Sequence, residues 1–209
     1  MRCLIVSGGN SPEDKLFLEE VKKSDYLIAA DKGVETFIRN NIKPDLVVGD
    51  FDSIEESFKC KLKNFNILQF NPEKDFTDSE IAFLEAVKKN PNELILLGFT
   101  GTRLDHTLAN IGLLKRALDK NINAYIIDNN NKMFIVNKST ILKGKLKQII
   151  SFQAYCSEVS NFFIKKARYP LEDYTLKLGD PRTVSNEFLK EDIEISFSKG
   201  EVLVIYARD

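Results

Sequence analysis

Short apolar runs alternate with helix-like segments over the first 130 residues of the chain. Runs of strand length lie at residues 3–6, 26–30, 46–48, 67–70, 94–97 and 124–127. Apolar residues at helical spacing between them predict helices that start near Ser11, as a cap, and that cover 34–40, 78–89 and 108–120. This order predicts an N-terminal Rossmann-like parallel sheet with helices on both faces.

The pattern changes after about Asn131, where the runs become β-rich and lose helical periodicity. They cover residues 133–136, 148–154, 159–164, 174–178, 193–197 and 202–206. Lys199 and Gly200, between the last two runs, predict a hairpin. We therefore expect an α/β fold with two domains, an α/β domain over residues 1–130 and an all-β sandwich or open barrel over residues 131–209.

The composition indicates the general class of protein and the redox state of its compartment. The chain has 209 residues, 43% of them hydrophobic and 29% charged, as is typical of a globular protein. Its net charge of -1 argues against a nucleic-acid or anionic-membrane partner. Cys3, Cys60 and Cys156 are too far apart for a CxxC pair, so we expect a reducing, cytoplasmic location without disulfides or zinc. No uncharged apolar stretch approaches the roughly 20 residues of a membrane helix.

Acidic side chains gather in two loops that follow predicted strands. Asp50 and Asp52 come directly after the run 46–48, and Asp78 comes in a second acidic segment after the run 67–70. Such carboxylates repel one another unless a cation lies between them, and Mg²⁺ held in this way generally also binds phosphates. Each loop also has a simpler interpretation, an Asx turn at Asp50 and a Thr77 cap with Glu80 as capping-box partner. Capping and metal binding are compatible, because a helix N-terminus attracts phosphate.

Further polar loops point to the same sheet edge, beyond the carboxyl ends of the strands. Residues 98–107 contain Arg103, which can bind phosphate as a fork, and Asp105, which can accept a proton or orient a hydroxyl. His106, the only histidine, is interpreted as structural rather than as a catalytic base. Asp31 lies in a second such loop, where either nucleotide contact or a plain turn would explain it.

Taken together and in this order, these loops resemble the thiamine pyrophosphokinase (thiamin diphosphokinase) family. The matching segments are residues 30–33, 44–53, 75–78, 98–106 and 185–187. The resemblance implies an α/β nucleotide- and Mg²⁺-binding catalytic domain, followed by a β-sandwich that binds thiamine and forms a homodimer. It implies transfer of a pyrophosphoryl group from ATP to the hydroxyethyl oxygen of thiamine, which yields thiamine diphosphate and AMP. Active sites are then expected at the subunit interface.

The resemblance also implies roles for particular residues. Mg²⁺ is expected on Asp50, Asp52 and Asp78, ATP along Asp31, Thr77 and Arg103, and thiamine against Asp105, Ser185 and Asn186; Asp50, Asp52, Asp78, Arg103 and Asp105 are the expected catalytic set. The chain departs from the family at Lys32, where a glycine is frequent, and in having no tryptophan to stack on thiamine. Phe188 or a tyrosine is the expected substitute.

Other functions remain open from the residues alone. A pyrophosphokinase of the same fold could act on another hydroxymethyl heterocycle such as a pterin, although residues 185–187 weigh against this. Paired aspartates also activate water in metal-dependent phosphohydrolases. A non-catalytic nucleotide-binding module is the third alternative, and the costly carboxylate cluster weighs against it.

Overall fold

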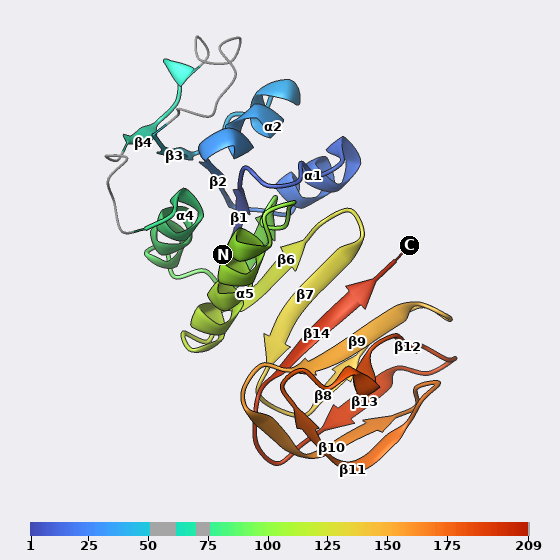
Figure 1. Ribbon diagram of the computed structural model, residues 1–209. Coiled ribbons are helices and arrows are strands. Elements are labelled where there is room, and N and C mark those ends of the chain that lie inside the picture. The colour runs from blue at the N-terminus through green and yellow to red at the C-terminus, as the bar shows by residue number, and fades with distance from the viewer. Residues whose placement is uncertain (51–61, 70–75, 209) are drawn as a thin grey trace. The chain divides into compact units, whose positions relative to one another are not determined.

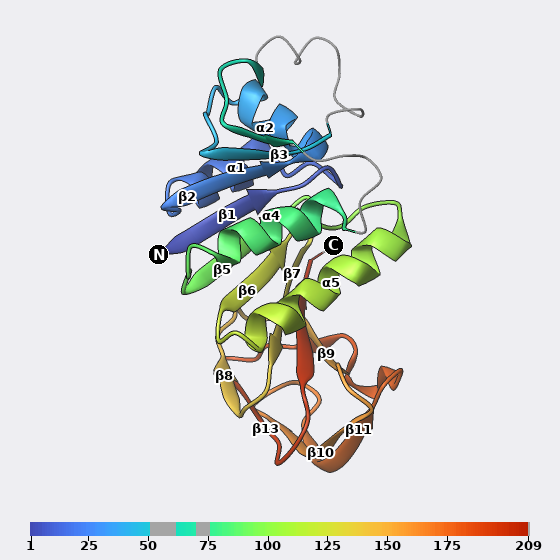
Figure 2. The same cartoon turned by 90° about the vertical axis from the view of Figure 1, so that its left-hand side faces the viewer.

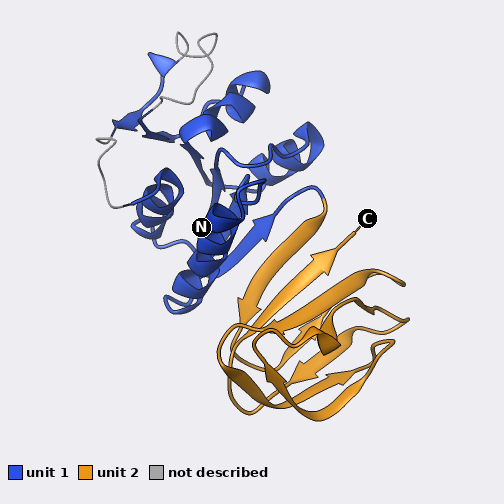
Figure 3. Ribbon diagram, in the orientation of Figure 1, with its two compact units in different colours: residues 1–129 blue, residues 130–209 orange. Residues whose placement is uncertain are grey.

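The computed structural model describes residues 1–50, 62–69 and 76–208. The chain divides into two compact units, residues 1–129 and 130–209 (Figure 3). Among the described helices, none combines the length and the apolar composition that crossing a bilayer requires.

A parallel sheet forms the centre of the first unit (Figure 1). Its strands are β1 (Arg2–Val6), β2 (Tyr26–Ala30), β3 (Leu46–Gly49), β4 (Ile67–Gln69), β5 (Glu93–Leu97) and β6 (Asn123–Ile127). They pair in the order β6-β5-β1-β2-β3-β4, and all of these pairings are parallel. Strands β2, β3 and β4 thus follow one another on one side of β1 in the sheet, and β5 and β6 follow on its other side. The switch in direction falls between β1 and β5.

Helices cover both faces of this sheet. They are α1 (Asp14–Val21), α2 (Val34–Arg39), α4 (Asp78–Val87) and α5 (Leu104–Leu118), with a 3-10 turn η1 (Asp31–Gly33) before α2. In Figure 2, α4 and α5 lie in front of the strands, and α1 and α2 lie behind them. The rings of Phe17 and Phe37 join α1 to α2 edge-to-face at 5.0 Å within the apolar cluster on that side. Strands β1, β2, β3 and β5 are consequently buried along most of their length, which explains their continuous apolar sequence.

Two predicted helix starts are wrong. Ser11 does not cap α1, which begins at Asp14; the Ser11 hydroxyl instead lies 3.3 Å from the Thr36 hydroxyl. Helix α5 begins at Leu104, four residues before the predicted start. Leu104 and Leu108 are both exposed, so the apolar spacing that marks the buried face appears only later in this helix.

The strands of the second unit pair antiparallel in two sets. One set has the order β12-β9-β14-β7, and the other, a separate four-stranded sheet, has the order β11-β10-β13-β8. Their strands are β7 (Asn131–Val136), β8 (Thr140–Leu142), β9 (Ile149–Ala154), β10 (Glu158–Lys165), β11 (Leu171–Lys177), β12 (Asn186–Glu187), β13 (Ile193–Ser196) and β14 (Val202–Ala207). One cluster of buried apolar side chains draws on both sheets, with Phe152 of β9 against Phe162 of β10 at 6.0 Å. The predicted mixed α/β architecture with a β-rich C-terminal part is confirmed.

The predicted hairpin at Lys199 and Gly200 is wrong. Strand β13 pairs with β10 and β8, whereas β14 pairs with β7 and β9. The two strands therefore belong to different sheets, and the turn between them passes from one sheet to the other. Gly200 supports this passage with a φ of +115°, a conformation that favours glycine.

Candidate active site

A cavity of about 520 Å³ lies in the first unit, where loops and helix starts meet. It is lined by residues 7–10 after β1, Asp31 after β2, Asp50 after β3, residues 76–79 at the start of α4, residues 98–103 after β5, and His106, Thr107 and Asn110 of α5. Two of these segments, residues 7–10 and 98–103, follow the carboxyl ends of β1 and β5, on either side of the point where strand order reverses. Open parallel sheets generally bind ligands at such a switch point.

The loops after β1 and β5 are joined by backbone hydrogen bonds. The Gly9 N–H donates to the Gly98 carbonyl at 2.9 Å, and the Asn10 N–H donates to the Thr100 carbonyl at 2.7 Å. A Cβ on Gly9 would lie 2.3 Å from the Thr100 carbonyl oxygen, so only glycine permits this approach. The cavity wall is therefore built before any ligand arrives.

Three predicted acidic residues line this one cavity from three different elements. Asp31 follows β2, Asp50 follows β3 and Asp78 begins α4. Asp52 lies outside the described residues. The part of the chain that is described holds no group of three His, Cys, Asp or Glu side chains close enough to bind a metal ion unaided. Mg²⁺ usually takes one or two carboxylates together with phosphate oxygens and water, and Asp50 and Asp78 fit that requirement.

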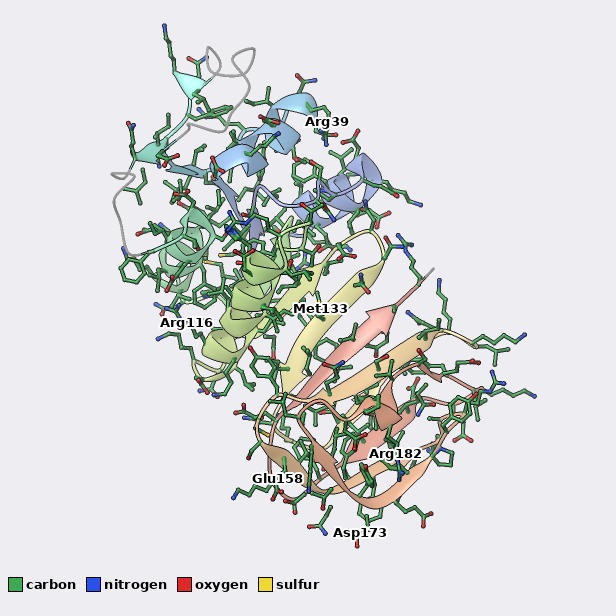
Figure 4. All side chains as sticks on the ribbon, viewed as in Figure 1. Arg39, Arg116, Met133, Glu158, Asp173 and Arg182 are labelled. Carbon is green, nitrogen blue, oxygen red and sulfur yellow. The ribbon has the colours of Figure 1, made fainter. Side chains whose placement is uncertain are left out.

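The first turn of α4 confirms the cap predicted at Thr77. The Thr77 hydroxyl accepts a hydrogen bond from the Glu80 N–H at 3.2 Å. The Glu80 side chain does not complete a capping box, because it pairs with Arg116 of α5 at 2.5 Å. Figure 4 labels Arg116 on α5. This ion pair between neighbouring helices replaces the expected local contact.

Arg103 and Asp105 form an exposed ion pair. Their Nη2 and Oδ2 atoms are 2.6 Å apart, and 69% and 63% of the two side chains are exposed. The hydrogen bond from Arg103 holds the pKa of Asp105 at about 2, below its ordinary range. Arg103 lines the cavity, where a guanidinium can bind phosphate.

Some cavity residues were not selected from the sequence. His106 was interpreted as structural, yet it lines the cavity with Asn110, whose amide donates to the Phe99 carbonyl at 2.8 Å. With α5 starting at Leu104, residues 103, 106, 107 and 110 follow the spacing of one helix face. A correct helix start would have grouped them. Ser7 and Ser79 also line the cavity, and no sequence pattern marked them.

Ser185 and Asn186, the residues expected to contact thiamine, belong to the second unit. Asn186 is 3% exposed, and its amide group accepts from the Tyr169 N–H at 3.0 Å and donates to the Tyr169 carbonyl at 2.7 Å. Asn186 also starts strand β12. Phe188, one expected replacement for tryptophan, is fully buried, whereas Tyr169 is 54% exposed.

Comparison with known proteins places the chain in a family. The model described as "Thiamin pyrophosphokinase, catalytic domain" matches residues 17–126, and the one described as "Thiamin pyrophosphokinase, vitamin B1 binding domain" matches residues 138–202. The chain belongs to the thiamine pyrophosphokinase family. The resemblance stated from the sequence is thereby confirmed.

Individual members of the thiamine pyrophosphokinase family match along most of the chain. The curated thiamine pyrophosphokinase of Bacillus subtilis (strain 168) is 33% identical over 186 residues, which cover 87% of each chain. A crystal structure of thiamine pyrophosphokinase from Bacillus subtilis has a TM-score of 0.89 at 30% identity and full coverage of both chains. A crystal structure from Geobacillus thermodenitrificans has a TM-score of 0.87 at 27% identity, covering 100% of this chain and 98% of that one.

Proposed function

We propose that this chain is a thiamine diphosphokinase, which transfers a pyrophosphoryl group from ATP to the hydroxyethyl oxygen of thiamine. The products are thiamine diphosphate and AMP. The observation that carries the proposal is the cavity at the β1–β5 switch point, which gathers Asp31, Asp50, Thr77, Asp78 and Arg103. This is the set that the family resemblance assigned to ATP and Mg²⁺, apart from Asp52.

Positioning and charge neutralisation account for most of the catalysis in phosphoryl-type transfer. In the proposed mechanism Asp50, Asp52 and Asp78 hold Mg²⁺, which supplies neutralisation of phosphate charge when it is bound. Arg103 binds the transferred group and offsets the negative charge that grows on it. The thiamine hydroxyl attacks the β-phosphorus and gives its proton to a nearby carboxylate, the bond from that phosphorus to the bridging oxygen of AMP breaks, and AMP leaves.

Asp105 is proposed to orient the thiamine hydroxyl rather than to take its proton while Arg103 is paired with it. A carboxylate whose pKa is about 2 is a weak base. Release of Arg103 toward phosphate would raise the basicity of Asp105. The two residues can thus work in sequence on the two substrates.

The second unit is proposed to supply the thiamine contacts and the dimer interface, with active sites between subunits of a cytoplasmic homodimer. Ser185 and Asn186 remain the proposed contacts of thiamine. Tyr169 is proposed as the ring that stacks on thiamine, because it is half exposed and its backbone is held by the Asn186 amide. The guanidinium carbon of Arg168 lies 5.3 Å from the centre of the Tyr169 ring, over one face, and Arg168 also pairs with Glu187 at 2.6 Å.

We further propose that residues 1–130 form a Rossmann-like catalytic domain and that residues 131–209 form a β-sandwich. The parallel order around β1 supports the first, and the apolar cluster shared by two antiparallel sheets supports the second.

The test is AMP formation from Mg-ATP with and without thiamine, with the thiamine product resolved by mass. Thiamine-dependent AMP together with a diphosphate product is the expected result. AMP that requires a pterin instead would support the pterin alternative, and phosphate release without an acceptor would support a hydrolase. Binding of ATP without AMP formation would leave only a nucleotide-binding module.

A further inference from the structure

Two serine hydroxyls connect the end of β1 to the first turn of α4. The Oγ atoms of Ser7 and Ser79 lie 2.6 Å apart, although 72 residues separate them along the chain. Both residues line the cavity that also contains Asp50 and Asp78. We propose that this hydroxyl pair is a positioning element, which holds Asp78 at its place in the cavity that Asp50 also lines. The inference rests on the proposed role of Asp78 as a Mg²⁺ ligand.

The Ser7 end of the pair is immobile. Ser7 is 8% exposed, and its N–H donates to the Leu97 carbonyl of β5 at 2.8 Å. The turn after β5 packs directly on it, since a Cβ on Gly98 would lie 2.3 Å from the Ser7 carbonyl oxygen. Gly98 can accept this contact because it has no side chain and has a φ of +71°. Ser7 therefore provides an anchor that is fixed to the centre of the sheet.

The Ser79 end lies next to the residue that must be positioned. Ser79 directly follows Asp78 in the first turn of α4, whose N-terminus is closed by the Thr77 cap. The same turn has a second attachment, the ion pair between Glu80 and Arg116. One attachment leads to the sheet and the other to α5, so together they restrict both translation and rotation of the turn. A displacement of about 1 Å at a catalytic group can cost on the order of a hundredfold in rate.

A direct contact between these hydroxyls and the nucleotide is the competing explanation, and the two make different predictions. A positioning pair acts through the Asp78 carboxylate. Its loss therefore lowers the affinity for the metal ion and leaves the contacts to the nucleotide in place. It also acts as a unit, so removing either hydroxyl has the effect of removing both. If each hydroxyl instead contacted the nucleotide directly, the losses of affinity in the two single variants would add in the double variant. Each variant would then also bind the nucleotide more weakly in the absence of metal.

The experiment measures Mn²⁺ affinity by electron paramagnetic resonance in the presence of α,β-methylene ATP, which prevents turnover. Ser7→Ala and Ser79→Ala should each weaken Mn²⁺ binding about tenfold, the lower end for loss of an outer-shell partner. The double variant should be no weaker than either single variant. Ser79→Thr keeps a hydroxyl and should retain wild-type affinity.

The matched control is Ser11→Ala, which removes a hydroxyl pair with Thr36 outside the cavity lining and should leave Mn²⁺ affinity unchanged. Thermal unfolding of every variant verifies that the chain remains folded. Unchanged Mn²⁺ affinity in folded Ser79→Ala would overturn the proposal, as would a double variant about a hundredfold weaker. Weaker binding of α,β-methylene ATP in the absence of metal would also overturn it. Failure of the wild-type chain to make thiamine diphosphate would refute the proposed function instead, since Mn²⁺ binding is read without turnover.

Discussion

Replacing Asn186 by alanine tests how the second unit holds its exposed tyrosine. The Asn186 side chain accepts hydrogen bonds from the backbone N–H groups of Tyr169 and Glu187, and donates one to the Tyr169 carbonyl. It makes these contacts while 3% exposed, between strand β12 and the segment that precedes β11. Asn186→Ala removes all three bonds and leaves the backbone groups of Tyr169 without this partner.

The three bonds set the expected magnitude. A typical intramolecular hydrogen bond contributes about 1 kcal/mol net, so Asn186→Ala should lower the free energy of unfolding by about 3 kcal/mol. Asn186→Asp keeps the acceptor for the Tyr169 N–H but places a carboxylate oxygen against the Tyr169 carbonyl. It should therefore destabilise the chain to a similar extent, although it is nearly the same size.

Urea unfolding followed by far-ultraviolet circular dichroism measures this loss, since the chain has no tryptophan for fluorescence. Asn137→Ala, at an exposed position just after β7, is the matched control and should remain within about 0.5 kcal/mol of wild type. If Asn186→Ala unfolds at the wild-type urea concentration with an unchanged slope, the Asn186 amide does not stabilise this segment. In the proposed function, the same variant should raise KM for thiamine more than KM for ATP.

Three further predictions concern the cavity. Gly9→Ala should lower the melting temperature, because its Cβ would meet the Thr100 carbonyl. The control Gly101→Ala, whose Cβ would have no heavy atom nearer than 3.6 Å, should melt close to wild type. Equal melting temperatures of the two variants would contradict the steric argument. Arg103→Ala should raise the pKa of Asp105 from about 2 toward its ordinary value in a carbon-13 titration. Because the pKa of Asp105 is depressed in the folded chain, the pair with Arg103 stabilises the folded chain above about pH 4 and ceases to do so as the pH falls toward 2. An unchanged pKa of Asp105 in Arg103→Ala would refute the pairing. Asp78→Asn should lower turnover by about a hundredfold or more while the melting curve is retained, and near wild-type turnover in the folded variant would remove Asp78 from the mechanism.

Local sequence predicted most of the strands and helices of the first unit to within a few residues. Strand β2 occupies the predicted residues, and β3, β5 and β6 differ from theirs by one residue at an end. Strands β2, β3 and β5 are buried along most of their length, so their apolar runs are continuous and easily read. The start of α5 was missed for the opposite reason, since its first turns carry exposed leucines and bury nothing.

Side-chain partnerships were not predictable in the same way. Glu80 satisfies a capping-box pattern three residues after Thr77, yet an arginine 36 residues further along the chain pairs with it. Asn186 belongs to a short motif associated with thiamine, and its amide is engaged by the backbone of Tyr169. In both cases a residue that is distant in sequence competes with the local partner. Such competition is decided only when the elements pack.

The sequence by itself determined the order of strands and helices and the polar loops at the ends of β2, β3 and β5. These follow from hydrophobic periodicity and from turn residues, which act over a few neighbouring positions. The sequence also carried the ordered motifs by which the chain resembles its family. Only the tertiary structure decided that the order of strands reverses between β1 and β5, and that Asp31, Asp50, Asp78 and Arg103 therefore line one cavity. It also decided the pairing of Ser7 with Ser79 and the separation of β13 and β14 into different sheets. Strand pairing and side-chain contact depend on which apolar faces bury one another across the whole chain, and no local pattern records that choice.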